Sequence, residues 1–341
     1  MKKGILLVLG LLSSTFFATL QAQYTQASYA FLQLERSAQT AAMGGKQYAL
    51  ANGSLANIYD NPAALQASQH HNLYVNAINY LADITHGNLL YARNIDSLWQ
   101  IAGGLSYLNY GKFERTLDNG ESAGEFSGSD KMLSIFGSRS WKNYHFGVQL
   151  KALFSNIDTY TSSILATDWG IMYSDTSTAL SLGLVVKNVG FVIDPYATSR
   201  ETLPFDLAFS LSKTLEHLPF RYAITVHHLH KWDIRFAPPE DETDLIFIDD
   251  NNTNKNYFGD KLMRHFTFGG ELFPDKAFNL RFGYNHLRRK ELSLNNVRYL
   301  NGYTFGFGIK VRQFKFDYTF APYHQAAATH LFALQVALGE F

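Results

Sequence analysis

The sequence predicts an all-β protein, a 14-stranded antiparallel transmembrane β-barrel of the outer membrane with an N-terminal hatch in its lumen. Three observations predict this fold. The chain begins with an export signal, its composition is rich in aromatic residues and poor in charge, and bulky apolar residues alternate with small or polar ones along repeated segments. Such alternation is expected of a wall with lipid on one side and a polar lumen on the other.

The first segment has the anatomy of a cleavable secretory signal. Two lysines precede the largely apolar run Gly4–Leu20, and the small residue Ala22 stands before a polar stretch. We expect cleavage near Ala22, because a membrane anchor would need a stop-transfer pattern that these residues lack. The predicted division is a signal peptide over residues 1–22, a hatch over residues 23–71 and a barrel over residues 72–341.

Composition narrows the class of protein further. The chain has no cysteine, so neither a disulfide framework nor a lipid-modified cysteine holds it. Its 29 basic and 29 acidic residues balance, which argues against nucleic acid as a partner. Charged residues make up 17% and aromatic residues 15%, yet no apolar run after the signal is long enough for a spanning helix. A soluble all-β periplasmic protein is the alternative.

The strand pattern favours the barrel. In the segment YTFGFGIKV, Tyr303, Phe305 and Ile309 alternate with Thr304 and Gly306, so bulky side chains share one face of the strand. Charged residues and glycines occupy the other face, which suits a polar interior. The same pattern predicts fourteen strands, at residues 72–81, 84–94, 98–109, 130–140, 142–155, 163–174, 177–188, 203–213, 219–231, 262–273, 276–287, 301–311, 313–321 and 327–338.

The connections between these strands support the same topology. Every second connection is short, as periplasmic turns are, and those between them are mostly long, as outer loops are. The longest predicted loops are 110–129, 189–202 and 232–261. An even strand count with alternating connection lengths is typical of a single-chain bacterial barrel.

Before the first strand lies AAMGGKQYALANGSLANIYDNPAAL, a stretch of small residues. Gly44 and Gly45 lack the spacing and the preceding strand of a phosphate-binding loop, and they allow close backbone approach instead. Pro62 restricts Asn61 to extended geometry and, with Ala63, makes a turn before the wall begins. We predict that this stretch folds into the lumen as a plug.

The remaining motifs give little indication of a metal site or a catalytic site. On the predicted strand 219–231, His228 and His230 share one face and His227 the other, so interfacial polar residues are favoured over a metal site. The acidic loop 241–260 resembles a calcium loop only loosely, and a solvated loop is the favoured interpretation. No nucleophilic serine elbow or matching base is present, so the residues indicate neither an enzyme nor a bound cofactor.

Several long segments resemble a known family. The chain resembles the PorV/PorQ group of type IX secretion outer-membrane proteins, which is similar to the FadL fatty-acid channels, fourteen-stranded barrels with an N-terminal hatch. The resemblance covers nearly the whole mature chain, and the residues that carry it are YAFLQLERSAQTAAMGGKQYAL, NPAAL, NYGKFERTLDNGESAGEFSGSDKML, PFDLAFSLSKTLEHLPFRYAITVHHLHKWDIRF and FDYTFAPYH.

The resemblance implies a non-enzymatic component of the cell-surface attachment complex. Its implied partners are outer-membrane lipid and a surface protein of the PorZ type, with PorU and PorV in the same complex. Processing chemistry would belong to PorU, and this chain would supply a membrane platform. The FadL-like Asn-Pro-Ala of the hatch is carried over to Asn61, Pro62 and Ala63. The alternative is a FadL-like channel for hydrophobic small molecules.

Overall fold

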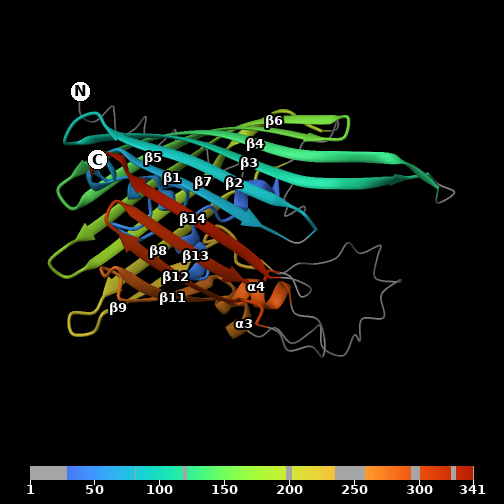
Figure 1. Ribbon diagram of the computed structural model, residues 1–341. Helices are drawn as coiled ribbons and strands as arrows, with labels where there is room; N and C mark the ends of the chain where they lie inside the picture. The colour runs from blue at the N-terminus through green and yellow to red at the C-terminus, as the bar shows by residue number, and fades with distance from the viewer. Residues whose placement is uncertain are drawn as a thin grey trace, which may run out of the picture.

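The chain forms a closed barrel of fourteen antiparallel strands within the residues that the computed structural model describes, which are 29–80, 82–117, 121–196, 202–234, 258–292, 300–323 and 328–340 (Figure 1). Each strand pairs with its neighbours in the sequence, and the last strand pairs with the first to close the ring. The predicted fold class is thereby confirmed. The strands are β1 Asn72–Asn79, β2 Thr85–Asn94, β3 Trp99–Thr116, β4 Ser122–Trp141, β5 Tyr144–Ile157, β6 Tyr160–Asp175, β7 Leu180–Asp194, β8 Asp206–Thr214, β9 Phe220–Val226, β10 Phe266–Leu272, β11 Phe278–Asn285, β12 Tyr303–Val311, β13 Phe314–Ala321 and β14 Thr329–Ala337.

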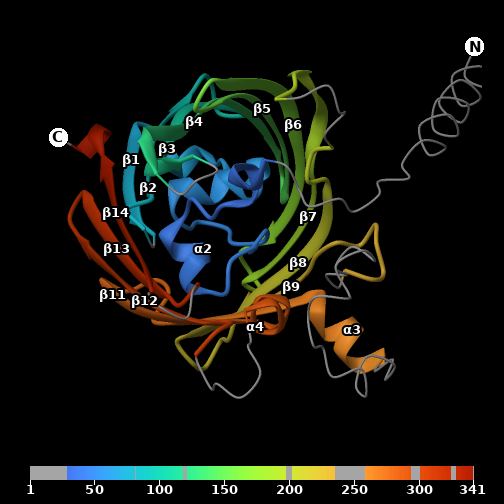
Figure 2. The same ribbon diagram turned by 90° about the vertical axis from the view of Figure 1, so that its right-hand side faces the viewer.

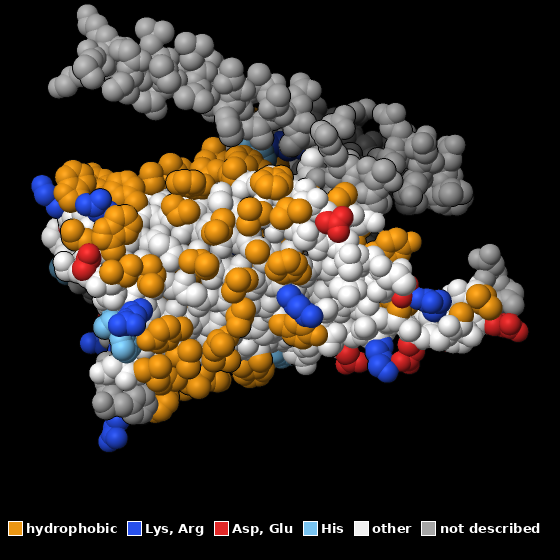
Figure 3. Space-filling view, turned by 90° about the horizontal axis from the view of Figure 1, so that it is seen from above, with side chains coloured by type: hydrophobic (Ala, Val, Ile, Leu, Met, Phe, Trp, Pro, Cys, Tyr) orange, Lys and Arg blue, Asp and Glu red, His pale blue; other side chains and the backbone are white. Residues whose placement is uncertain are grey.

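Residue alternation sets the two faces of the wall. Along the first part of β3, Gln100, Ala102 and Ser106 are buried toward the lumen, while Ile101 and Leu105 are exposed. The other strands repeat this pattern, so large apolar side chains cover much of the outer face (Figure 3). A contiguous exposed apolar surface of this kind needs a nonaqueous neighbour, and a lipid bilayer provides one.

The connections divide by side as the sequence predicts. Short turns join the strands at the end where the chain terminus after β14 also lies, and the longer connections lie at the opposite end (Figure 1). One exception is the β5–β6 connection, predicted as a loop over 156–162, which is a two-residue turn at Asp158 and Thr159.

The predicted loop 110–129 is largely strand. β3 and β4 run on past the wall as a paired hairpin, which we call the arm and define as residues 110–128 (Figure 1). These strands have 18 and 20 residues, whereas about 9–11 residues cross a membrane. Phe113 stacks on Phe126 with ring centroids 5.3 Å apart, and Lys112 pairs with Glu125 at 2.8 Å.

Two other strand predictions were too long. The predicted strand 219–231 ends at Val226, as β9, and a turn follows it. The predicted strand 262–273 begins as the helix α3 Phe258–Arg264, and only then does β10 start. A second short helix, α4 His286–Glu291, follows β11. Among the described residues no helix has the length and apolarity to cross a membrane.

The N-terminal segment lies inside the barrel. Its described part, residues 29–71, crosses the ring of strands when the barrel is viewed along its axis (Figure 2). Most of its residues are buried, and its apolar side chains form one large and two small clusters with inward side chains of the wall. We call residues 29–71 the hatch; residues 1–28, with the expected signal peptide, lie outside the described part. Its helices are η1 Ala30–Gln33, α2 Ala38–Ala42, η2 Leu55–Tyr59, η3 Pro62–Ala64 and η4 Ala67–Gln69.

Candidate functional site in the barrel lumen

The Gly-Gly pair sits against the β10–β11–β12 wall. Gly44 and Gly45 have φ values of +91° and +74°, which side-chain-bearing residues rarely adopt. A Cβ added at Gly44 would lie 2.7 Å from Thr267 Cγ2, and one added at the wall residue Gly283 would overlap the Gly44 backbone nitrogen. Glycine therefore meets glycine across this contact, which explains how closely the hatch approaches the wall.

The Asn-Pro-Ala turn sits against β5 and β6. Asn61 has extended geometry, with φ −133° and ψ 111°, as its position before Pro62 predicts. Its side-chain oxygen accepts a hydrogen bond from the Ala63 amide at 3.0 Å, and its amide nitrogen donates to the Tyr48 carbonyl at 2.7 Å. Asn61 thus caps the start of η3 and links it to the hatch backbone at Tyr48. Two wall glycines, Gly147 and Gly170, leave the space that this turn occupies.

Wall side chains provide hydrogen-bond partners for the irregular hatch backbone. Short 3₁₀ turns leave carbonyls unpaired, and a buried carbonyl without a partner is costly. The donors are hydroxyl, amide and ammonium groups that point inward from the strands. The pairs are Asn76 to Arg36 O at 2.6 Å, Ser138 to Leu65 O at 2.5 Å, Lys187 to Tyr59 O at 2.8 Å, Ser212 to Ala49 O at 2.7 Å, Thr304 to Ala42 O at 3.0 Å and Thr319 to Ala38 O at 2.6 Å.

Charged groups of the wall pair with one another at the lumen surface. Arg281 contacts Glu271 at 2.8 Å and Asp317 at 2.6 Å, and Arg221 contacts Glu271 at 3.1 Å. A hatch residue joins this network, since the Gln39 side-chain amide donates to Glu271 at 3.3 Å. These buried charges are compensated by partners, as charges away from water must be. Through Gln39, this charge network also links strands β9, β10, β11 and β13 to the hatch.

A cavity of about 210 Å³ remains between the hatch and the start of β8. Its lining combines charged residues with apolar ones. The charged residues include Arg36, Lys46, Asp60, Lys187 and Asp206, and the apolar ones include Leu32, Leu34, Leu203 and Phe205. Burial raises the pKa of Asp60 to about 6, with the nearby Lys187 charge opposing part of that rise. Arg36 lies over the Phe31 ring at 5.0 Å and donates to the Phe31 carbonyl at 2.7 Å. Such a lining suits an occupant with both polar and apolar groups better than a pure hydrocarbon.

Two histidines lie beside this cavity, and the prediction that they continue a strand is wrong. His227 and His228 follow β9 rather than continuing it, and His228 has φ +55°. This turn places the Nδ1 atoms of the two rings 2.6 Å apart, although an extended strand would have put them on opposite faces. Burial lowers the pKa of both imidazoles, and that of His228 falls to about 3. Both are therefore neutral near pH 7.

No residue pattern near His227 in the sequence predicts this turn. The backbone N–H of His228 donates to Asp206 Oδ1 at 2.7 Å, and Asp206 lies on the neighbouring strand. Most of the calcium-like loop 241–260 lies outside the described residues, and its described end forms part of α3. Gly44, Gly45, Asn61, Pro62 and Ala63 all lie in the lumen, but they contact opposite stretches of the wall and do not form one ligand site.

Comparison with known proteins bears on the fold. No model of a known protein family matches the sequence, and no curated protein does. The toluene transporter TodX of Pseudomonas putida is structurally similar, with 12% identity, 88% of this chain and 96% of that chain covered, and a TM-score of 0.52. For the toluene transporter TbuX of Ralstonia pickettii the values are 10%, 88%, 97% and 0.54.

A Pseudomonas aeruginosa FadL homologue is also similar, at 10% identity, with 87% of this chain and 96% of that chain covered and a lower TM-score of 0.45. At such identities a structural likeness establishes the fold and nothing of the activity. The closed ring of fourteen strands and the similarity to TodX and TbuX agree: the chain has the fold of these two transporters.

Proposed function

We propose that this chain is a non-enzymatic outer-membrane platform of the type IX secretion system, which anchors a PorZ-type surface protein in the complex with PorU and PorV. The segments that resemble the PorV/PorQ group support the proposal. The observation that carries it is the filled lumen: the hatch occupies the barrel and is hydrogen-bonded to the wall around the ring. A platform needs no path through the lumen, so a lumen filled by the hatch fits this role.

The outer-membrane location is supported by the wall. Aromatic and aliphatic side chains are exposed on the outer face, and the barrel fold is that of outer-membrane proteins. Aromatic rings also lie near the short turns, where an interfacial girdle is expected. These are Trp99, Trp141 and Tyr144, each exposed by 45% or more.

The cavity argues for a platform rather than for a hydrocarbon path. A hydrophobic solute bound there would remove water from Lys46, Asp60 and Lys187 without supplying hydrogen bonds. Channels for such solutes need mainly apolar pockets. The hatch would also have to move, and its backbone is bonded to several strands at once.

The arm supplies a surface for a partner. It extends beyond the wall on the side of the long connections, and acidic and basic side chains gather at the right of Figure 3. Lys112 pairs with Glu125 within the arm, and Arg115 of the arm pairs with Asp158 of the β5–β6 turn. Phe113 and Leu117 are 40% and 52% exposed on it. Exposed aromatic and apolar groups surrounded by charge are typical of protein interfaces.

A second candidate is a FadL-like channel for hydrophobic small molecules. The structural neighbours favour it, because both TodX and TbuX are described as toluene transporters and cover nearly all of this chain. It requires that the hatch rearrange to open a path past the charged cavity.

Co-purification from detergent-solubilised outer membrane separates the two candidates. The platform predicts that the full-length chain brings down a multidomain surface protein, and that a deletion strain releases this protein and its cargo into the medium. Retention of both on the surface of the deletion strain would refute the platform. The channel instead predicts a loss of hydrophobic-solute uptake in that strain, with surface proteins unchanged.

A further inference from the structure

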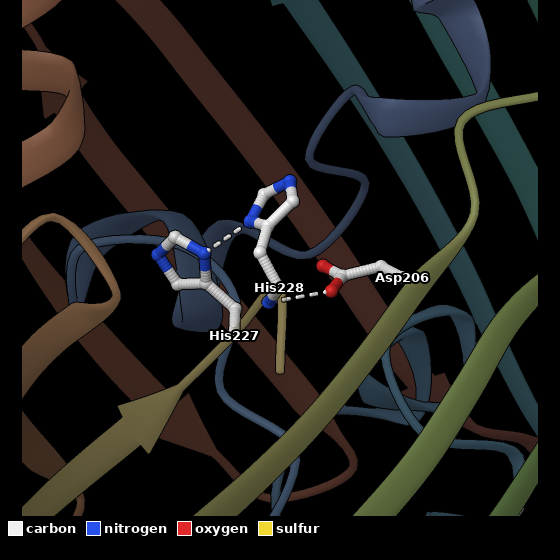
Figure 4. Close-up of side chains that lie close together, drawn as sticks. All are labelled: Asp206, His227 and His228. Atoms are coloured by element: carbon white, nitrogen blue, oxygen red, sulfur yellow. Dashed lines mark hydrogen bonds between the residues drawn. The ribbon is translucent and has the colours of Figure 1, made fainter. Parts of the chain in front are cut away.

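A cluster of side chains of metal-ligating type lines the cavity, next to the ion pair that Lys46 of the hatch makes with Asp206. It comprises Asp206 at the start of β8 and the two histidines that follow β9. One ligand atom from each residue lies within 4.8 Å of the others. Figure 4 shows the two imidazoles side by side, with the Asp206 carboxylate pointing toward His228.

The backbone around the cluster is held from three sides. Asp206 accepts the His228 amide hydrogen, and the His227 amide donates to the His265 carbonyl at 3.0 Å. The His265 ring in turn bonds the His227 carbonyl at 2.8 Å and the Trp232 carbonyl at 3.1 Å. The ligand side chains thus stand on a turn that is fixed before any ion binds, which lowers the cost of organising a site.

Internal hydrogen bonding does not by itself account for the cluster. The His227 side chain is completely buried, and its Nε2 atom has no hydrogen-bond partner among the described residues. A buried polar atom left unpaired costs about 1–3 kcal/mol. The two Nδ1 atoms are the ones placed to bind an ion, and Nε2 of His227 stays unpaired with or without one, so stability alone does not account for this histidine pair.

We propose that His227, His228 and Asp206 bind a divalent transition-metal ion of the Zn²⁺ class. Two neutral imidazoles and a carboxylate form a donor set that suits Zn²⁺ and its neighbours and that Ca²⁺ or Mg²⁺ would not select. The ion would join the ends of β8 and β9 and keep one coordination position open to the cavity, which Asp206 and His228 both line.

The geometry requires one small movement. Tetrahedral coordination at about 2.0–2.1 Å separates two ligand nitrogens by about 3.3 Å, and the two Nδ1 atoms now lie 2.6 Å apart. The His228 ring has room to turn, because it is only partly buried and faces the cavity. His230 is the nearest further donor, with its ring centroid 5.9 Å from that of His228.

Lys46 of the hatch competes with the ion. Its ammonium group lies 3.5 Å from Asp206 Oδ2 and places a positive charge beside the site. Neutralising this charge removes the repulsion of a cation and frees the carboxylate. Lys46→Gln is therefore expected to tighten Zn²⁺ binding several-fold, which no purely structural role of the histidines would produce.

The test is a titration of the full-length, tag-free chain in detergent, stripped with EDTA and then supplied with Zn²⁺ or with Co²⁺ as a spectroscopic probe. We expect one equivalent to bind, with the visible absorption of tetrahedral Co²⁺. Asp206→Asn, His227→Gln and His228→Gln should each weaken binding by about tenfold or more. His217→Gln is the matched control, because His217 is exposed in the turn at the opposite end of the barrel.

The absence of saturable binding by the wild-type chain would overturn the proposal. Binding that survives in the His227→Gln/His228→Gln double variant would overturn it too, as would binding that is lost equally in His217→Gln. If a ligand variant fails to fold, the cobalt spectrum of the wild-type chain and the Zn²⁺ affinity of Lys46→Gln still test the site. A Zn²⁺ affinity that falls or stays unchanged in Lys46→Gln contradicts the claim that Lys46 and the ion compete for the Asp206 carboxylate.

Discussion

Wall glycines determine how closely the hatch can approach the strands. A Cβ at Gly283 would overlap the backbone of Gly44, and a Cβ at Gly306 would lie 2.6 Å from Ala42 Cβ. These glycines face inward, in phase with the buried side of their strands. From the sequence alone, small residues on the inner face predict that something else must fill the lumen, but they do not say which hatch residue meets which strand.

Gly283→Ala should loosen the hatch. Because the added methyl group meets backbone atoms, which cannot rotate away, we expect a loss of about 1–3 kcal/mol in unfolding free energy and faster proteolysis of the hatch. Urea unfolding and limited proteolysis in detergent measure both effects. Gly103→Ala is the matched control, since a Cβ there meets nothing within 4 Å. Equal behaviour of the two variants would contradict the described packing.

Asp60 makes stability depend on pH. Its pKa is raised to about 6 from 3.8 because burial penalises the carboxylate. A group whose folded-state pKa is raised favours folding fully below the unfolded pKa, and that contribution is lost as the pH rises through the folded value. Stability should therefore fall by up to about 3 kcal/mol between pH 4 and pH 7 through this group.

Urea unfolding of the wild-type chain and of Asp60→Asn across this range checks the assignment. The asparagine keeps the shape of the side chain and removes its titration, so the fall between pH 4 and pH 7 should shrink by that amount. A variant with the same pH profile as the wild type would show that another group titrates.

At the scale of elements, alternation located all fourteen strands because each has one lipid-facing side of bulky residues. The outer parts of β3 and β4 were not predicted as strands, because they have no lipid-facing side of this kind. In KFERTLDNGESAGEF polar residues predominate on both faces, as expected of a hairpin that water surrounds, so the period-two signal fades. The turn after Val226 was missed because its decisive acceptor, Asp206, belongs to another strand.

Removing the arm should separate folding from partner binding. Lys112 and Ser127 are paired across β3 and β4, so residues 113–126 of the arm can be replaced by an Asn-Gly turn that suits a two-residue hairpin. We expect the unfolding free energy of the barrel to stay within about 1 kcal/mol, because Tyr110, which donates to Asp130 and packs on the lumen cluster, is kept. Co-purification of the surface partner should be lost.

A finer variant keeps the arm at full length. Phe113→Ser with Phe126→Ser removes the aromatic stack and leaves the Lys112–Glu125 pair in place. It should weaken capture of the partner at least tenfold if these rings are binding hot spots. Full capture by both arm variants would move the partner contact to another surface.

At the scale of the whole molecule, the barrel and the internal hatch could be predicted from the sequence, since they follow from periodicity and small-residue content. The histidine cluster and the charged cavity could not. They arise where the ends of β8 and β9 meet the hatch, and residues far apart in the chain create them: Lys46, Asp60, Lys187, Asp206 and His228. Contacts of that kind have no local sequence pattern.

The central claim is that the barrel works with its hatch in place. Because the chain has no cysteine, one introduced pair can lock the hatch cleanly. Met43→Cys with Gly269→Cys suits this purpose, since Met43 Cβ lies 2.8 Å from the position of a Cβ at Gly269, and a small shift gives the separation of a disulfide. The same protein after reduction is the control.

The decisive measurement compares the oxidised and reduced forms of this variant in cells that lack the native chain, scoring retention of the surface protein and uptake of a hydrophobic solute. The platform predicts full surface retention and unchanged uptake with the hatch locked. Loss of uptake on oxidation, restored by reduction, with the surface protein unaffected, would contradict it and establish the channel.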